Sequence, residues 1–463
     1  MMRFMKLVPL MVLAGCAVGP DYKTPAVPVT TQFVGGDTSP LAQVAYRAWW
    51  RDYRDPLLNE LVETGMKQSL DILQAQERIR QARAQLRQTG VNEALSGSAS
   101  GSKTRSGVTK GGGSGWDNAT GTLDADFVLD LFGGLRRERE AAKANLAASQ
   151  ANVGTERLAW LAELVADYAD ARYYQQALEL TRKTIATRQD TFNITQQEVN
   201  AGAATTLEQA EAEAALESAK ADLPNYLAQF RAKVFAIATL LNVPAGPLMD
   251  RMEKGAAPLR IPTDSATGVP ADLLRNRPDI RYYEAVLHQE VATVGVDTAA
   301  LYPSLSLSGT VSGTSKSTSW SFGPTITQAI FNQGSLRAAR DAQVSAAKQA
   351  EIDYRSAITS AVEDVQVAQS NLRQYRAQAA QLNRAAQSYS KALELGRTTY
   401  RNGGMTLLDL LDTDRSEASA RISAASAANS AAQEWATLQI AIGAGAGYAE
   451  SPEEAPAPKA AAK

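Results

Sequence analysis

Two short stretches, one in each half of the chain, decide how it folds. The first runs Val199-Asn200-Ala201-Gly202-Ala203-Ala204-Thr205-Thr206-Leu207-Glu208. The second runs Tyr400-Arg401-Asn402-Gly403-Gly404-Met405-Thr406-Leu407-Leu408-Asp409. In each stretch, glycine supplies the positive φ that ends a helix, and a threonine can cap the helix that follows. Each stretch therefore predicts the turn of a helical hairpin; we call residues 199–208 the first tip and residues 400–409 the second tip.

Long helical patterns lead to and from both tips. Residues 135–200 and 336–402 precede the tips, and at about 1.5 Å per residue each predicts a helix of about 100 Å. Return helices are expected over 206–241 and 406–442. Because a compact domain does not need helices of this length, we expect them to pack as antiparallel coiled coils.

A shorter helix and a β-hairpin precede each long helix. The helices are expected at 57–91 and 278–301, and the hairpins at 92–131 and 304–330. In the first hairpin, apolar Leu123, Ala125, Phe127 and Leu129 alternate with polar Thr122, Asp124, Asp126 and Asp130. Period two predicts a strand with one apolar and one polar face. Four strands of about ten residues have the length of membrane-crossing β-strands, although a soluble hairpin layer packed on helices is the alternative.

The two halves of the chain repeat one another. Gly202 and Gly403 hold equivalent places, so the offset is 403 − 202 = 201 residues. This tandem duplication places the first repeat at 57–243 and the second at 271–443. The remaining segments are a signal peptide at 1–15, an extended segment at 16–56, a proline-rich connector at 244–270 and a tail at 444–463 that we expect to be disordered.

The N-terminus carries a targeting signal. Arg3 and Lys6 precede an apolar run that is too short to span a bilayer. The run ends Leu13-Ala14-Gly15-Cys16, which looks like a bacterial lipobox. Because Cys16 is the only cysteine and has no disulfide partner, we expect it to be lipidated and to attach the chain to outer-membrane lipid. The alternative is a signal peptide with an incidental cysteine.

Composition argues against several function classes. The net charge of −2 gives no electrostatic case for binding nucleic acid. The only histidine, His288, lies in a predicted helix one turn after Glu284, where we expect a surface or packing role. Gly111–Gly113 lacks the Lys-Ser/Thr context of a phosphate-binding loop, and the sequence has no metal-ligand motif. The chain is therefore predicted to have no enzymatic activity, no cofactor and no metal site.

Four strands cannot close a barrel by themselves. An open sheet in lipid would leave unpaired N–H and C=O groups along two edges, each at a cost of several kcal/mol. Eight strands are about the minimum for a small barrel, so membrane insertion requires more than one copy. Three copies would supply 3 × 4 = 12 strands, with the acidic face of Asp124 and Asp126 lining a wet lumen. The predicted fold class is mainly α, with a membrane β-barrel.

The stretch Val269-Pro270-Ala271-Asp272-Leu273-Leu274-Arg275-Asn276-Arg277-Pro278-Asp279-Ile280-Arg281 resembles the signature of the TolC/OprM family of outer-membrane efflux factors. Matching motifs are Trp49-Trp50, Tyr302-Pro303-Ser304-Leu305-Ser306-Leu307 and the segment from Leu408 to Asp412. The resemblance covers Cys16 to about Gly443. It implies a homotrimer in which an outer-membrane β-barrel continues into a periplasmic α-helical barrel. Such trimers are passive exit ducts of tripartite efflux pumps, with a periplasmic adaptor and an inner-membrane transporter of the RND type as partners.

The resemblance also implies a gate at the second tip. In the family this tip closes the periplasmic mouth with a bulky apolar residue and aspartates, and Leu408, Asp409 and Asp412 fall at those positions. Threefold symmetry would gather the carboxylates into rings, which repel one another and could hold a cation. The alternative is that both aspartates are ordinary acids of a first helical turn. The family's basic latch residue is replaced by Met405, which leaves Tyr400 without an obvious partner from this tip.

The first tip lacks the aspartate pair, because Glu208 and Glu211 align with Asp409 and Asp412. We expect it to face the adaptor and to leave space for side chains of that partner. The residues expected to contact the adaptor are Gly202, Ala203, Ala204, Gly403, Gly404 and Met405. Export of proteins or of heavy-metal cations is an alternative to export of small molecules. A structural coiled-coil lipoprotein without a pore is the alternative from a different class.

Overall fold

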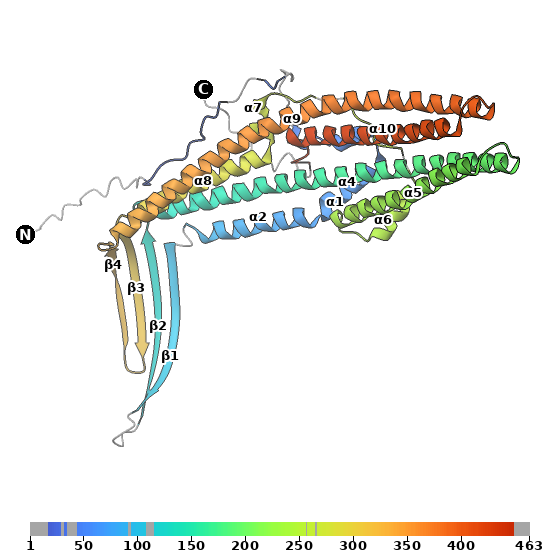
Figure 1. Cartoon of the computed structure of the whole chain (residues 1–463). Coiled ribbons are helices and arrows are strands. Elements are labelled where there is room, and N and C mark those ends of the chain that lie inside the picture. The colour runs from blue at the N-terminus through green and yellow to red at the C-terminus, as the bar shows by residue number, and fades with distance from the viewer. Residues whose placement is uncertain are drawn as a thin grey trace, which may run out of the picture. The chain divides into compact units, whose positions relative to one another are not determined.

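The structure is a computed structural model that describes residues 17–28, 32–34, 44–90, 94–107, 115–255, 257–263 and 266–448, without the side chain of residue 275 (Figure 1). The predicted signal peptide, Cys16 and the glycine turn at 111–113 lie outside the described residues. The chain forms two compact units. The strand unit contains Met1–Pro28, Gln76–Asn152 and Asp279–Ala357, and the tip unit contains Val29–Ala75, Val153–Pro278 and Ile358–Lys463.

One antiparallel sheet dominates the strand unit (Figure 1). Its strands are β1 (Leu95–Ser106), β2 (Trp116–Leu129), β3 (Ser304–Thr314) and β4 (Thr318–Thr327), in chain order. The register pairs Leu123 of β2 with Val311 of β3, and Val311 with Trp320 of β4. Both predicted hairpins are therefore present, and they join into one sheet of four strands.

The long helices lie close to their predicted ranges. α4 spans Gly134–Asn200 and α9 spans Gln333–Arg401. The return helices α5 (Thr206–Leu240) and α10 (Leu407–Ala441) have 35 residues each and begin 407 − 206 = 201 residues apart, as the duplication requires. Among the residues that the structure describes, no helix is both long and apolar enough to cross a bilayer.

The predicted single helix at 57–91 is wrong, because two helices replace it. α1 (Pro56–Gln68) begins at Asp55, whose carboxylate accepts from the backbone amides of its first turn. Ser69 then takes an extended ψ of 128°, and α2 (Leu70–Gln88) follows. Ser69 is buried, and its amide donates to the Gly65 carbonyl, so the break lies inside the packed structure.

A similar break precedes the helix predicted at 278–301. α7 (Pro270–Asn276) ends at Arg277, and α8 (Pro278–Ala299) begins at the next residue. Pro278 disfavours a helical conformation at Arg277, which is extended, with a ψ of 121°. The connector 244–270 also holds a helix, α6 (Ala245–Met252), which buries Leu248 and Met252 on one face. The segment 16–56 is likewise not wholly extended, because short 3-10 helices form at Val44–Tyr46 and Trp49–Tyr53.

An aromatic cluster forms part of the core of the tip unit. Trp49, Trp50, Tyr53 and Trp435 are almost fully buried, and the ring of Trp435 meets that of Tyr53 edge-on at 5.1 Å. The Trp49 indole donates to the Ala444 carbonyl at 3.1 Å. The prediction of disorder from residue 444 is therefore wrong for 444–448, which turn back over this cluster with the positive φ that glycine permits.

The segment after Cys16 packs in the strand unit. The Val18 amide donates to the Phe132 carbonyl at 3.0 Å, and the Arg137 guanidinium donates to Asp21 at 2.7 Å. The Tyr22 ring stacks on the His288 ring with 4.2 Å between their centroids, and the imidazole Nε2 lies 2.9 Å from the Glu140 carboxylate. The single histidine is thus a packing residue, as the sequence predicts, although its carboxylate partner is Glu140.

Candidate functional site

The second tip turns at Gly403, whose φ is 71°, and α10 begins after Thr406. The Thr406 hydroxyl accepts from the Asp409 amide at 3.2 Å and donates to the Asp409 carboxylate at 2.6 Å. Leu408, Asp409 and Asp412 are exposed on the single chain, with Leu408 60% exposed. The three predicted gate residues therefore lie together at one end of α10, with exposed side chains.

A basic residue that the sequence analysis missed accompanies Asp412. Arg415 lies one turn later and reaches the Asp412 carboxylate at 3.6 Å, with both side chains 70% exposed. Exposed pairs of this kind contribute about 0.2–1 kcal/mol. The i, i+3 spacing of the pair was the only signal in the sequence, and it is too common on helices to single out.

Two buried leucines attach the second tip to a neighbouring helix. Leu407 and Leu411 are buried against Ala212 of α5, and the partly buried rings of Phe192 and Tyr400 pack against them. Burying a leucine side chain stabilises by roughly 1.5–3 kcal/mol. The second tip is therefore attached by apolar contacts to the hairpin that forms the first tip.

Polar contacts join α9 to α4 close to the tips. The Tyr400 hydroxyl donates to the Glu198 carboxylate at 2.7 Å, although the sequence offered no partner for it. The Asp190 carboxylate accepts from Arg397 at 2.6 Å and from Arg401 at 3.3 Å. Burial, and then the bond to Glu198, raise the pKa of Tyr400, so its phenol stays protonated as a donor.

A buried ion pair lies further along the same hairpins. Arg188 of α4 donates to the Asp414 carboxylate of α10 at 2.6 Å, and the two side chains are 12% and 7% exposed. Arg188 also donates to the Ala215 carbonyl at 2.8 Å, which links α4, α5 and α10. Removing one member of such a pair costs about 3–5 kcal/mol, because the other charge is left buried.

The first tip has its own complete cap. The Thr205 hydroxyl accepts from the Glu208 amide at 3.2 Å, and the Glu208 carboxylate accepts from the Thr205 amide at 2.7 Å. This reciprocal capping box lowers the pKa of Glu208, chiefly through the Thr205 backbone N–H. Leu207, which aligns with Leu408, is 66% exposed.

The residues expected to face an adaptor lie at the two turns. Gly202, Ala203, Gly403 and Gly404 are exposed, and Ala204 and Met405 are half-buried. A Cβ added at either Gly202 or Gly403 would meet no atom within 4 Å, so both turns are open on the single chain.

The sheet has two chemically different faces. Directly opposed residues share a face, so the register places Asp124 beside Thr310, and Asp126 beside Ser308. The Thr310 hydroxyl donates to Asp124 at 2.8 Å, and the Ser308 hydroxyl donates to Asp126 at 2.6 Å. The polar face is therefore a hydroxyl surface in which both carboxylates of β2 are held by hydroxyl groups of β3.

The opposite face of the sheet is apolar. Its large exposed side chains, with exposed fractions of 41–78%, are Leu95, Leu123, Phe127, Val311, Trp320, Phe322 and Ile326. A contiguous apolar face of this extent marks a surface that contacts lipid or another protein.

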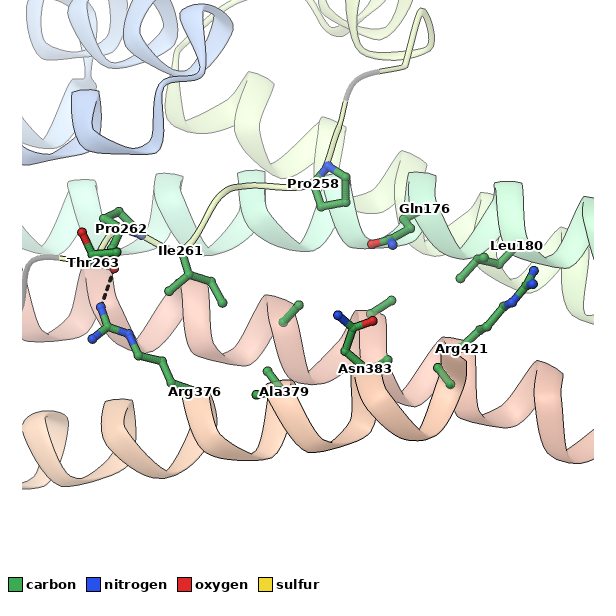
Figure 2. Close-up of a pocket in the computed structure, with 15 residues that line it drawn as sticks. Gln176, Leu180, Pro258, Ile261, Pro262, Thr263, Arg376, Ala379, Asn383 and Arg421 are labelled. Carbon is green, nitrogen blue, oxygen red and sulfur yellow. Dashed lines mark hydrogen bonds between the residues drawn. The ribbon is translucent and has the colours of Figure 1, made fainter. Parts of the chain in front are cut away.

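An open pocket of about 660 Å³ lies in the tip unit (Figure 2). Segment 257–263 crosses it, and alanines of α9 and α10 form much of its wall. Arg376 donates to the Pro262 carbonyl, and Arg421 bonds Ser390 and Glu417. Both arginines of the wall already have partners within the unit, so the pocket offers no evident charged ligand site. Within the described ranges, no three His, Cys, Asp or Glu side chains are grouped to hold a metal ion.

A sheet with one apolar and one hydroxyl face, in a chain whose helices reach about 100 Å, is typical of outer-membrane channels with a periplasmic helical part. The chain belongs to the outer membrane efflux protein family, whose model matches residues 61–243 and 269–444. The two matched segments correspond to the two repeats, and the gap between them falls in the predicted connector.

Three similar proteins illustrate the family. Nodulation protein T of Rhizobium leguminosarum bv. trifolii is 35% identical over 94% of this chain and 96% of its own. The toluene efflux pump outer membrane protein TtgC of Pseudomonas putida is 29% identical over 89% of this chain and 88% of its own. The solved outer-membrane channel OprN superposes with a TM-score of 0.82 and 28% identity, over 93% of this chain and all of that one.

The family resemblance seen in the sequence is therefore confirmed, as are the mainly helical fold, the four strands per chain and the tandem duplication. The chain is an outer-membrane efflux channel, and its family works in tripartite pumps with a periplasmic adaptor and an inner-membrane transporter. Family and fold are those of channels.

Proposed function

We propose that three copies of this chain form a passive efflux duct. The observation that carries this proposal is the two-faced sheet with open edges at β1 and β4. Pairing β4 of one copy with β1 of the next would satisfy both edges and close 3 × 4 = 12 strands. The apolar face would then contact lipid, and Asp124 and Asp126 would line the lumen. The duct supplies a path and carries out no reaction.

The proposed organisation follows the duplication. Repeats 57–243 and 271–443 each contribute a hairpin to the barrel and a helical hairpin to the periplasmic part. Cys16, at the end of the lipobox, is the proposed lipid attachment site. The segment from residue 17 packs against Phe132, Arg137 and His288, which would hold the attachment point close to the strand unit.

The second tip is the proposed gate. Leu408, Asp409 and Asp412 would meet their copies around the threefold axis and narrow the mouth. The second tip is attached to the first hairpin through Tyr400–Glu198, Arg188–Asp414 and the buried leucines. Opening would move the second tip outward and break these contacts. An adaptor bound at residues 202–204 and 403–405 would favour the open arrangement, and an RND-type transporter would supply the cargo.

Small organic compounds are the proposed cargo. One relative is named for toluene efflux, and a hydroxyl-lined wall with paired carboxylates offers few strong binding sites to delay such molecules. Heavy-metal cations and proteins are the second candidates. The carboxylates of Asp409 and Asp412 favour cations over anions at the gate, which is the specific observation for the metal alternative.

Planar-bilayer conductance of the purified protein tests this proposal. The wild type should give rare, small openings, and an Asp409→Ala/Asp412→Ala variant should conduct more often and lose selectivity for cations. The matched control is Glu208→Ala/Glu211→Ala at the equivalent places of the first tip, which should leave conductance unchanged. The absence of channels in both the wild type and the gate variant would rule out the duct.

The lipid attachment is tested separately. A Cys16→Ser variant should assemble and conduct after purification but carry no acyl mass. Loss of the variant from the outer membrane would show that sorting depends on the lipid, and an unchanged mass would exclude lipidation at Cys16.

A further inference from the structure

The apolar face of the sheet ends in charged residues. Leu95 of β1 pairs with Phe127, so the odd-numbered residues of β1 share the apolar face. Counting along β1 places Lys103 and Arg105 on this face, where they pair with Ala119 and Asp117. Among the described strands, the only charged residues on the apolar face are Lys103, Arg105 and Asp117.

The charges begin where an apolar membrane band would end. From Leu129 to Ala119, the apolar face of β2 carries no charged residue. Ten residues at about 3.3 Å each, tilted by about 40°, span a height of about 25 Å, which is the height of the lipid-facing band of outer-membrane barrels. α4 begins soon after Leu129, so Lys103 and Arg105 lie at the opposite end of the strands, which in the proposed duct is the outer surface of the cell.

Among the residues that the structure describes, the cations at this end have only one, weakly placed, ionic partner. Asp117 lies 3.9 Å from Lys103 and 3.9 Å from Arg105, and both contacts are too long for hydrogen bonds. The side chains of Lys103 and Arg105 are 74% and 77% exposed. Two cations share one carboxylate, so the patch keeps a net positive charge and unused N–H donors.

We propose that Lys103 and Arg105 bind the phosphate groups of outer-leaflet lipids. This inference rests on the proposed barrel, because only insertion brings headgroups to this level. A guanidinium matches a phosphate through paired N–H donors, and an ammonium adds a point charge. The ligand class is thus a phosphorylated lipid headgroup.

Native mass spectrometry of the full-length protein in a neutral detergent tests the inference, with diphosphoryl lipid A as the probe and diacylglycerol as the phosphate-free comparison. Wild type should retain diphosphoryl lipid A in preference to diacylglycerol. A Lys103→Gln/Arg105→Gln variant should bind diphosphoryl lipid A at least about tenfold more weakly, because two charge-assisted contacts are lost. Asp117→Asn should bind it more tightly, because the competing carboxylate is removed.

Lys316→Gln is the matched control. Lys316 is exposed in the turn between β3 and β4, outside the strands, so its loss removes a cation from the same end of the sheet and should change affinity less than about twofold. Equal affinity of wild type and the double variant for diphosphoryl lipid A would overturn the inference, as would equal retention of diacylglycerol. Conductance of the same preparations separates the two proposals: channels without lipid preference reject only the lipid site, whereas no channels in any variant reject the duct.

Discussion

The first and second tips occupy equivalent places in the two repeats but are held in different ways. At the first tip, the Glu208 carboxylate reaches back to the Thr205 amide and completes a capping box. At the second tip, the shorter Asp409 side chain bonds the Thr406 hydroxyl. Both caps are closed by their own residues, but only the first is a reciprocal capping box.

The first residue of the return helix is buried at the second tip and exposed at the first tip. Thr206, the first residue of α5, is exposed, whereas its counterpart Leu407 is 1% exposed. Leu407 packs on Ala212, so the second tip depends on the first hairpin for its core. The two repeats therefore share the turn but differ in the contacts that hold it in place. A tip closed by its own contacts suits a fixed docking point. A tip whose buried leucine depends on the neighbouring hairpin suits a moving part.

The largest effect is expected from the buried ion pair. Asp414→Leu leaves the Arg188 charge without its partner and should cost about 3–5 kcal/mol in the free energy of local opening. Hydrogen exchange should rise strongly in 407–415 and little in 199–208, and conductance should increase. The Arg188→Met/Asp414→Leu variant should recover most of the protection. Equal exchange at both tips in the single variant would show that they open together.

The apolar anchor comes next. Leu407→Ala should destabilise the second tip by about 2–5 kcal/mol, through lost burial and the cavity left behind. Its control, Leu207→Ala, removes a leucine that is 66% exposed and should stay within about 0.5 kcal/mol. Hydrogen exchange of the two return helices checks both values. A similar cost at Leu207 would contradict the distinction between the tips.

The hydrogen bond between α9 and α4 should have a smaller effect. Tyr400→Phe removes the donor to Glu198 and should cost about 1.5–3 kcal/mol, as for other hydrogen bonds to charged groups. Opening events in a bilayer should become more frequent. Tyr389→Phe, on the same helix and 44% exposed, serves as the control and should not change them. Unchanged gating in Tyr400→Phe would remove this contact from the proposed mechanism.

The smallest effect concerns acid pH at the first tip. Because the pKa of Glu208 is lowered from its ordinary value of 4.5, its capping contribution is present above pH 4.5 and is lost as pH falls through the lower folded value. Proteolysis at 199–208 should therefore increase in wild type as the pH falls below 4.5 and through the lowered pKa of Glu208. Glu208→Gln should weaken this dependence, and an identical pH profile in the two proteins would refute the role of the carboxylate.

The sequence predicted the elements that carry a strong local signal. Residues 135–200 and 336–402 keep helical spacing over many turns, and the glycine–threonine pairs mark their ends, so α4 and α9 were found within a few residues. The alternation around Asp124 and Asp126 likewise identified β2 and its polar face. These features need only neighbouring residues to be recognised.

Contacts across long separations in the sequence escaped prediction. Tyr400 and Glu198 are 202 residues apart, and Arg188 and Asp414 are 226 apart, so no local pattern connects them. Residues 444–448 looked disordered because glycine and alanine dominate, yet Trp49, 395 residues before Ala444, holds them. α6 had a usable signal, since Leu248 and Met252 are four apart after a proline, but the surrounding prolines obscured it.

The open edges at β1 and β4 have a consequence for how the protein reaches the membrane. In the proposed duct a single chain cannot leave its sheet edges unpaired in lipid, so insertion would have to wait for the other copies. If encounter of three chains limits the process, the rate of channel appearance should follow about the third power of the chain concentration. A twofold drop in synthesis would then slow assembly about eightfold, and the unassembled chains would be exposed to periplasmic proteases for correspondingly longer.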